Sequence, residues 1–290
     1  MTHFYSTIDL HMHSTVSDGT NTPKELLERV KERGISLFSL TDHDAVEGCA
    51  TILSLLQKED PGFICGVEFS CEDELGKYHI LGYGYNPQNK GINALANTCH
   101  AYRVNRVAER LSYLEKAFDI SFTKEEVTAL MALDNPGKPH IANLLIKHGF
   151  ADTMADAFHQ YLNKFHGEEK HVGPQLAIET ILQAGGIPVL AHPSYGSGTE
   201  RIVGEEMEKR LIRLLAYGIR GVEAFYSTFP AALQNELLFL AEKYHLYVTA
   251  GSDYHGTNKP IRLGDTHLTE ENRPKGLTAF LQNVTILNNR

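Results

Sequence analysis

The chain has 290 residues, of which 42% are hydrophobic and 22% are charged, a composition typical of globular proteins that excludes intrinsic disorder. Its formal charge of −9 excludes the broad basic face of proteins that coat nucleic acid, so we expect no stable binding to duplex nucleic acid. A local basic pocket for a small anion is still compatible with this charge.

Two further features of the composition limit the class of protein. No stretch reaches membrane-spanning length, and the N-terminus lacks the basic start and apolar run of a signal peptide. The four cysteines form no Cys-x-x-Cys pair and are expected to be reduced thiols. We therefore expect a cytoplasmic protein without a membrane partner. The fifteen histidines, against five methionines, call for a search for metal ligands.

Short apolar runs that end in polar residues recur along the chain and predict strands. They are Ser6–Leu10, Ile35–Leu40, Gly62–Val67, Tyr78–Tyr83, Ile187–Ala191, Ile219–Val222 and Leu246–Ala250. Helical patterns separate most of them: Pro23–Arg33, Asp44–Lys58, Pro174–Ala184, Glu206–Tyr217 and Pro230–Tyr244. Thr22 is a candidate N-cap of the first helix and Gly34 its stop. Continuous apolar runs that alternate with helices predict an α/β barrel or a layered α/β sheet.

The alternation breaks in the middle of the chain. Between about residues 89 and 173 only helices are expected, at His100–Phe118, Lys124–Leu133, Pro139–His148 and Met154–Lys164. We predict that residues 89–172 form an inserted helical cap subdomain over a barrel made by residues 1–88 and 173–290. Residues 89–172 contain ten basic and ten acidic residues, so the net negative charge belongs to the barrel segments.

Candidate metal ligands follow the first two strands. His11 and His13 are two apart, so in extended backbone both imidazoles point to one face and can reach one cation. Asp18 stands in a Ser-Asp-Gly sequence, where it is either a ligand or an ordinary turn residue. Thr41-Asp42-His43-Asp44 places an imidazole between two carboxylates, one of which is expected to cap the next helix.

The next two candidates come from the middle strands. Glu68 ends an apolar run, and an unpaired buried carboxylate there would be costly. His79 follows too soon for a parallel crossover, so the two strands are expected to be antiparallel neighbours. The hairpin would then return His79 to the end of the sheet that carries Glu68.

Later strand ends add His192, Asp253 and His255, each of which could instead be a hydrogen-bonded structural group. In total, six histidines and three carboxylates fall at the ends of strands, and active sites on barrels form at the carboxyl ends of their strands. Nitrogen and oxygen ligands without thiolate suit Mn, Fe or Zn. Nine donors exceed what one ion takes, which predicts two or three divalent ions and suits metal-assisted hydrolysis.

These motifs resemble those of the PHP (polymerase and histidinol phosphatase) superfamily. The resemblance rests on His11-x-His13, Ser17-Asp18-Gly19, Thr41-Asp42-His43, Glu68, His79, Ala191-His192-Pro193 and Ser252-Asp253-Tyr254-His255-Gly256. It covers nearly the whole chain and is closest to the stand-alone PHP phosphoesterases, which include nucleoside 3′,5′-bisphosphate phosphatases and 5′-to-3′ exoribonucleases. It implies a distorted seven-stranded (βα) barrel with a site for three metal ions.

The resemblance also implies how the ligands are divided among the ions. The first ion would take His11, His13, Glu68 and Asp253; the second Asp18, His43 and His255; and the third Glu68, His79 and His192. Glu68 would bridge two ions. Some PHP proteins have His where this chain has Asp18, which leaves the metal preference of the second site open.

The predicted cap offers candidate substrate residues. Arg103 and Arg106 are three apart and share one helix face, while Lys138 and His140 open the next helix at an N-terminus suited to an anion. Both segments look like the phosphate- and nucleotide-holding cap elements of the subgroup. The alternative is that the two arginines are solvated helix charges. Lys170 and His171 are weaker candidates.

These observations predict a metal-dependent phosphoesterase in which a hydroxide held by the ions attacks a phosphomonoester and no side chain acts as nucleophile. The expected substrate is a small phosphorylated molecule, a nucleoside 3′,5′-bisphosphate or the 5′ end of a short oligoribonucleotide. Two alternatives stay open: a phosphatase for histidinol phosphate or a similar small molecule, and a metal-binding regulatory module without activity.

Overall fold

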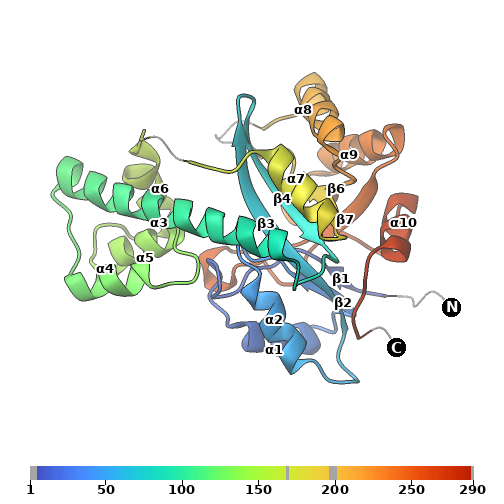
Figure 1. The fold of residues 1–290 in the computed structure, drawn as a ribbon, viewed down its shortest axis with the longest axis horizontal. Helices are drawn as coiled ribbons and strands as arrows, with labels where there is room; N and C mark the ends of the chain where they lie inside the picture. The colour runs from blue at the N-terminus through green and yellow to red at the C-terminus, as the bar shows by residue number, and fades with distance from the viewer. Residues whose placement is uncertain (1–4, 168–169, 196–200, 289–290) are drawn as a thin grey trace.

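A seven-stranded sheet curls into an almost closed barrel in the computed structural model, which describes residues 5–167, 170–195 and 201–288 (Figure 1). The strands follow one another in chain order: β1 (Ile8–Asp9), β2 (Leu37–Leu40), β3 (Gly62–Asp73), β4 (Gly76–Tyr83), β5 (Ile187–Leu190), β6 (Gly221–Tyr226) and β7 (Tyr247–Gly251). The backbone N–H of Leu10 donates to the carbonyl of Ala250 at 2.9 Å, and Met12 forms a parallel bridge with Tyr254. The first and last strands therefore meet, and the predicted distorted α/β barrel is confirmed.

Strand β4 runs antiparallel to both of its neighbours, whereas the other neighbouring strands pair in parallel. The antiparallel pairing predicted for the strands of Glu68 and His79 is therefore confirmed. Strand β3 continues to Asp73, beyond the predicted end at Val67, because it forms a long hairpin with β4. Within this hairpin His79 lies opposite Ser70, close to Glu68.

Six helices surround the barrel: α1 (Pro23–Glu32), α2 (Glu47–Leu55), α7 (Pro174–Gln183), α8 (Gly204–Tyr217), α9 (Ala231–Lys243) and α10 (Lys275–Asn283) (Figure 1). Thr22 caps α1 as predicted, in a capping box with Glu25. Helix α2 begins at Glu47, later than the predicted Asp44, because Asp44 has a left-handed backbone with φ of +52°. Helix α10 was not predicted from the sequence.

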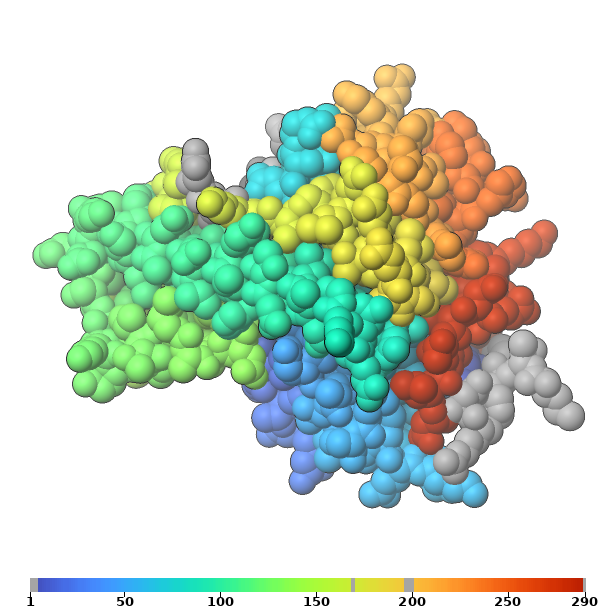
Figure 2. Space-filling view, in the orientation of Figure 1, coloured from blue at the N-terminus to red at the C-terminus, as the bar shows by residue number. Residues whose placement is uncertain are grey.

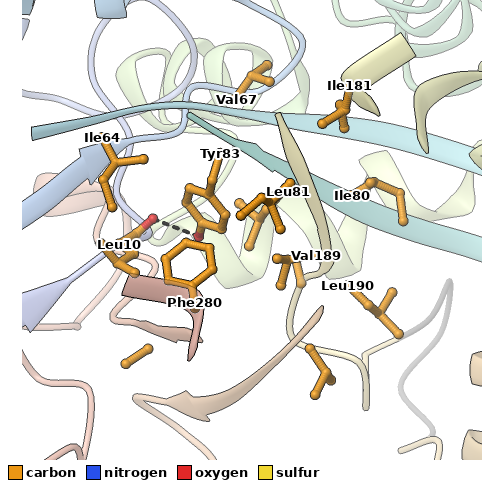
Figure 3. Close-up of a cluster of buried hydrophobic side chains, with 14 of the residues drawn as sticks. Leu10, Ile64, Val67, Ile80, Leu81, Tyr83, Ile181, Val189, Leu190 and Phe280 are labelled. Atoms are coloured by element: carbon orange, nitrogen blue, oxygen red, sulfur yellow. Dashed lines mark hydrogen bonds between the residues drawn. The ribbon is translucent and has the colours of Figure 1, made fainter. Parts of the chain in front are cut away.

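The interior of the barrel is filled with apolar side chains. Tyr83 is fully buried, its hydroxyl donates to the carbonyl of Leu10 at 2.9 Å, and Phe280 of α10 packs edge-on against its ring (Figure 3). The side chains of Ile64 and Leu81 lie in the same cluster (Figure 3). This packed interior supports the polar residues that follow the strands.

The segment between β4 and α7 is built from helices: α3 (Lys90–Phe118), α4 (Lys124–Met131), α5 (Lys138–Lys147), α6 (Met154–Gln160) and the short η1 (Leu162–Lys164). Helix α3 begins ten residues before the predicted His100. Its first turns bury Ile92 and Leu95 in the barrel core, whereas Val107 and Leu114 belong to a separate apolar cluster with residues of α5. The rest of this segment extends to one side of the barrel (Figures 1 and 2).

None of the helices in the described ranges combines the length and apolar character needed to cross a membrane.

Candidate active site

The fold brings together all nine residues that the sequence predicted as metal ligands. They form four overlapping groups, and within each group the candidate ligand atoms lie within 4.8 Å of one another. The members are His11, His13, Asp18, His43, Glu68, His79, His192, Asp253 and His255. Most of them come from the end of a strand or from the loop after it. Glu68 and His79 instead lie within β3 and β4, on the two arms of the long hairpin.

Glu68 lies at the centre of this cluster and is fully buried. Its two carboxylate oxygens lie 2.9–3.3 Å from the nearest ring nitrogens of five histidines: His11, His13, His43, His79 and His192. Burial alone raises the pKa of Glu68, but the imidazoles, His43 foremost, outweigh it and hold the pKa well below its usual value. The carboxylate is therefore ionised and able to act as a ligand.

Several buried polar atoms of the cluster have no hydrogen-bond partner within the described part of the chain. They include Asp18 Oδ1, and also Glu68 Oε2 and His43 Nδ1, which lie 3.0 Å apart but without the geometry of a hydrogen bond. Buried polar atoms are normally paired, so unpaired ones gathered in one place are the donors that a bound ion would use. Ligands of an ion with bonds of about 2.1 Å are themselves about 3.0–3.4 Å apart, close to the nitrogen–oxygen distances around Glu68. The residues present fit a group of divalent ions.

The turns after the strands aim these ligands through unusual backbone conformations. His192 and Asp253 have φ values of +24° and +61°, in the left-handed region that non-glycine residues rarely adopt. Gly19 ends the Ser-Asp-Gly turn, where a Cβ atom would lie 2.2 Å from the carbonyl oxygen of His13. Only glycine fits at this position, so the turn can fold back and place Asp18 beside the histidines.

Two residues that the sequence analysis missed hold Asp253. The hydroxyl of Tyr226 and the ammonium group of Lys259 each donate to Asp253 Oδ2 at 2.6 Å. The other oxygen, Oδ1, faces Nε2 of His13 at 3.2 Å. Lys259 stands only a few residues after His255, so its sequence position could have indicated that it lies near the ligands. The position of Tyr226 on β6 gave no such indication.

A cavity of about 300 Å³ opens between the ligand cluster and the helical segment. Asp18, His43 and His79 line it on the barrel side. Six basic side chains lie among the other lining residues: Lys77, Arg103, Arg106, Arg110, Lys138 and His171. Arg110 and Lys77 were not predicted, although Arg110 lies one helical turn beyond Arg106 on the same face of α3.

Two of the four predicted substrate residues, Arg103 and His140, form hydrogen bonds within the protein, and those of Arg103 join the helical segment to the barrel. The Arg103 guanidinium donates from Nε to Asp44 Oδ2 at 2.5 Å and from Nη2 to Ser70 Oγ at 2.9 Å. His140 Nδ1 accepts from the N–H of Gly137 at 3.1 Å, inside the first turn of α5. Through its hydrogen bonds to Asp44 and Ser70, Arg103 fixes α3 against the barrel.

The other two predicted substrate residues lie in a crowded basic environment. Burial, followed by the neighbouring positive charges, lowers the pKa of Arg106 to about 10 and that of Lys138 to about 8. The pKa of Arg110 is lowered to about 10 for the same reasons. Clustered like charges repel one another unless a counter-ion enters, so this end of the cavity is suited to an anion.

Comparison with known proteins identifies relatives over nearly the full length of the chain. The PHP domain family matches residues 9–175. A 3′,5′-nucleoside bisphosphate phosphatase from Chromobacterium violaceum is 30% identical over 281 residues, which cover 92% of this chain and 93% of the relative. A 5′-3′ exoribonuclease from Haemophilus influenzae is 31% identical over 88% of this chain and 92% of its own length. Among solved structures, a metal-dependent phosphoesterase from Bifidobacterium adolescentis superposes with a TM-score of 0.83 and 28% identity over 96% of both chains.

Proposed function

The chain belongs to the PHP domain family and is a metal-dependent phosphoester hydrolase, and we propose that it removes a terminal phosphate from a nucleotide. The family membership confirms the resemblance that the ligand motifs predicted. The observation that supports the nucleotide proposal is the cavity of about 300 Å³, which has metal ligands at one end and basic side chains at the other. A substrate with two phosphates would satisfy both ends at once. We therefore favour a nucleoside 3′,5′-bisphosphate, followed by the 5′ end of a short oligoribonucleotide.

The ligand cluster would hold two or three ions of Mn, Fe or Zn. Following the PHP resemblance, the first ion would be held by His11, His13, Glu68 and Asp253, the second by Asp18, His43 and His255, and the third by Glu68, His79 and His192. These sets overlap with the groups whose ligand atoms lie within 4.8 Å of one another but are not identical to them. When bound, the ions would lower the pKa of a water molecule and neutralise charge that develops on the phosphoryl oxygens. Glu68, which faces five imidazoles, would be shared between two of them.

The chain's own side chains would orient the substrate. Residues 89–172 would act as a cap on the barrel formed by residues 1–88 and 173–290, and Arg106, Arg110 and Lys138 would bind the phosphate that is not cleaved. Arginine can bind phosphate through two parallel hydrogen bonds, which fixes the direction of the ester bond as well as its position. No side-chain nucleophile is part of this proposal. The four cysteines are buried free thiols, which supports our proposal that the protein works in the cytoplasm, where thiols stay reduced.

The alternatives are less well supported. Histidinol phosphate carries an ammonium group, which the basic end of the cavity would repel. A regulatory module without activity does not agree with a chain whose full-length relatives are named as phosphatases and nucleases. A phosphate-release screen with added Mn, covering nucleoside bisphosphates, mononucleotides, histidinol phosphate and short RNAs, tests the proposal. We expect the highest kcat/KM on a bisphosphate, and a preference for histidinol phosphate would overturn the proposal.

Metal content is the first testable consequence. We expect the purified protein to contain two or three equivalents of Mn, Fe or Zn, and chelation to abolish hydrolysis. Elemental analysis and phosphate release before and after chelation measure both effects. Less than one equivalent after reconstitution with Mn would rule out a centre of several ions.

Lys138 gives a consequence for the pH dependence of substrate binding. Burial and the charges of Arg110, Lys77 and Arg106 lower its pKa to about 8, so Lys138 is charged below this pH and becomes neutral above it. We expect KM for a nucleoside bisphosphate to rise about tenfold as pH increases through 8, because the substrate loses one hydrogen bond from a charged group. Lys138→Arg keeps its charge in this range and should remove the inflection. An unchanged inflection in Lys138→Arg would assign it to another group.

A further inference from the structure

Glu223 on β6 is a buried carboxylate that belongs to none of the ligand motifs. It is completely inaccessible to solvent. Glu223 Oε1 lies 3.0 Å from His11 Nδ1, and Oε2 accepts a hydrogen bond from the backbone N–H of His192 at 2.9 Å. The neighbouring strand makes room for it, since a Cβ atom on Gly251 would lie only 2.4 Å from Oε1. One carboxylate thus contacts two residues of the ligand cluster from behind.

We propose that Glu223 is a positioning residue that fixes His11 and His192 as ligands of two different ions, an inference that rests on the metal centre of the proposed function. An ionised carboxylate only accepts hydrogen bonds. Glu223 Oε1 is placed to accept a proton held on His11 Nδ1, which would leave the lone pair of Nε2 free for an ion; Nε2 is directed into the cluster, 3.2 Å from Glu68 Oε2. Histidines that bind metals commonly have such a carboxylate behind them, which sets the ring orientation and strengthens the ligand.

The contact with His192 acts on the backbone. His192 has φ of +24°, a conformation that costs free energy for a residue with a side chain. The hydrogen bond from its N–H to Glu223 Oε2 holds this turn, which places His192 Nε2 3.0 Å from Glu68 Oε1. The rings of His11 and His192 are also stacked, with centroids 5.7 Å apart. Glu223 therefore supports the proposed first and third ions together.

The proposed second ion depends on other contacts. Among the described residues, no hydrogen bond joins Glu223 to Asp18, His43 or His255. His255 is oriented instead by the carbonyl oxygen of Asp253, 2.8 Å from its Nδ1. The proposal therefore predicts a selective effect: loss of Glu223 weakens two ion sites and leaves one intact.

Glu223→Gln is the informative variant because it preserves shape but replaces one acceptor oxygen with a donor NH₂ group. If the amide oxygen accepts from the His192 N–H, the NH₂ group faces His11 Nδ1 and drives the ring proton to Nε2, where it blocks the ligand lone pair. We expect the affinity of two of the ions for Mn to fall about 10- to 100-fold. The measurement is metal content after equilibrium dialysis against a series of Mn concentrations.

Asp60→Asn is the control for a general loss of stability. The Asp60 side chain is mostly buried, accepts from the backbone N–H of Gln57 at 2.9 Å and pairs with Lys31 at 2.6 Å, and among the described residues its hydrogen bonds reach none of the nine ligand residues. We expect Asp60→Asn to lower the melting temperature and to keep the affinity of the ions. Equal loss of ions in both variants, or full retention in Glu223→Gln, would overturn the proposal.

Glu223→Asp keeps the charge and provides a second test of the proposal if Glu223→Gln does not fold. Its shorter side chain can reach only one of the two partners, so we expect weaker binding of at least one ion. Full retention of every ion would again overturn the positioning role. Wild-type protein that binds no ions would instead refute the metal centre itself, whereas wild-type protein that binds ions but cleaves no nucleotide would refute only the substrate.

Discussion

Glu68→Gln is expected to lower kcat/KM by about 10³-fold, more than the loss of His79. Glu68 is fully buried, and its oxygens face five imidazoles at 2.9–3.3 Å. In the proposed centre the substitution removes one negative charge from two ions at once. Metal ions contribute several kcal/mol to stabilisation of the transition state, and a loss of about 4 kcal/mol corresponds to about three decades in rate.

The comparison with His79→Ala makes this prediction specific. His79 contacts only one of the two carboxylate oxygens of Glu68, Oε1. Burial lowers the pKa of the His79 imidazole to about 4, so the ring is neutral and available as a ligand. Its removal would strip one ligand from the third ion and should cost less than Glu68→Gln. Glu74→Gln is the control, since Glu74 is exposed in the turn of the same hairpin and pairs with Arg213. Near-wild-type rates in both Glu68→Gln and His79→Ala would show that neither residue is a ligand.

The barrel and the ligand cluster were accessible from the sequence because both depend on local patterns. Apolar runs located all seven strands, and the short spacing between Glu68 and His79 indicated the antiparallel hairpin. Most ligands stand at or soon after the end of an apolar run, so the order of the predicted strands also indicated which side chains would meet. The Thr22 cap of α1 was likewise visible, since a capping box is a contact between residues three apart.

The contacts that were missed join residues far apart in the chain. Glu223 directly follows the predicted strand Ile219–Val222, but only the closed barrel brings it to His11, 212 residues away. The start of α2 was misplaced because the carboxylate of Asp44 accepts from the backbone N–H of Ser70 and pairs with Arg103, rather than capping the helix. Tertiary contacts of this kind override local helix signals.

Arg106→Ala is expected to lower kcat/KM for a nucleoside bisphosphate about ten- to a hundredfold, with metal content unchanged. Arg106 lines the basic end of the cavity, and its Nη1 donates to the carbonyl of Lys170 at 2.6 Å. A hydrogen bond between charged groups contributes about 1.5–3 kcal/mol, which gives this range of rates. A small ester such as p-nitrophenyl phosphate has no second phosphate and should be affected less.

Arg103→Ala should behave differently, although both arginines share one face of α3. Arg103 pairs with Asp44, which is buried, so its removal leaves a carboxylate without its counter-charge. Loss of one partner of a buried ion pair costs about 3–5 kcal/mol of folding free energy. We therefore expect Arg103→Ala to unfold at a lower temperature and to lose activity on both substrates.

The measurement that separates these roles is kcat/KM on the bisphosphate and on p-nitrophenyl phosphate, together with melting temperature and metal content, for Arg106→Ala, Arg103→Ala and Lys116→Ala. Lys116 is exposed in the last turn of α3, so its variant reports the effect of removing a cap charge that lies outside the cavity. An equal loss on both substrates in a stable Arg106→Ala variant would place this arginine on the phosphate that is cleaved. A variant as active as Lys116→Ala on both would make Arg106 a structural residue, whose hydrogen bond to Lys170 fastens the end of the helical segment to α3.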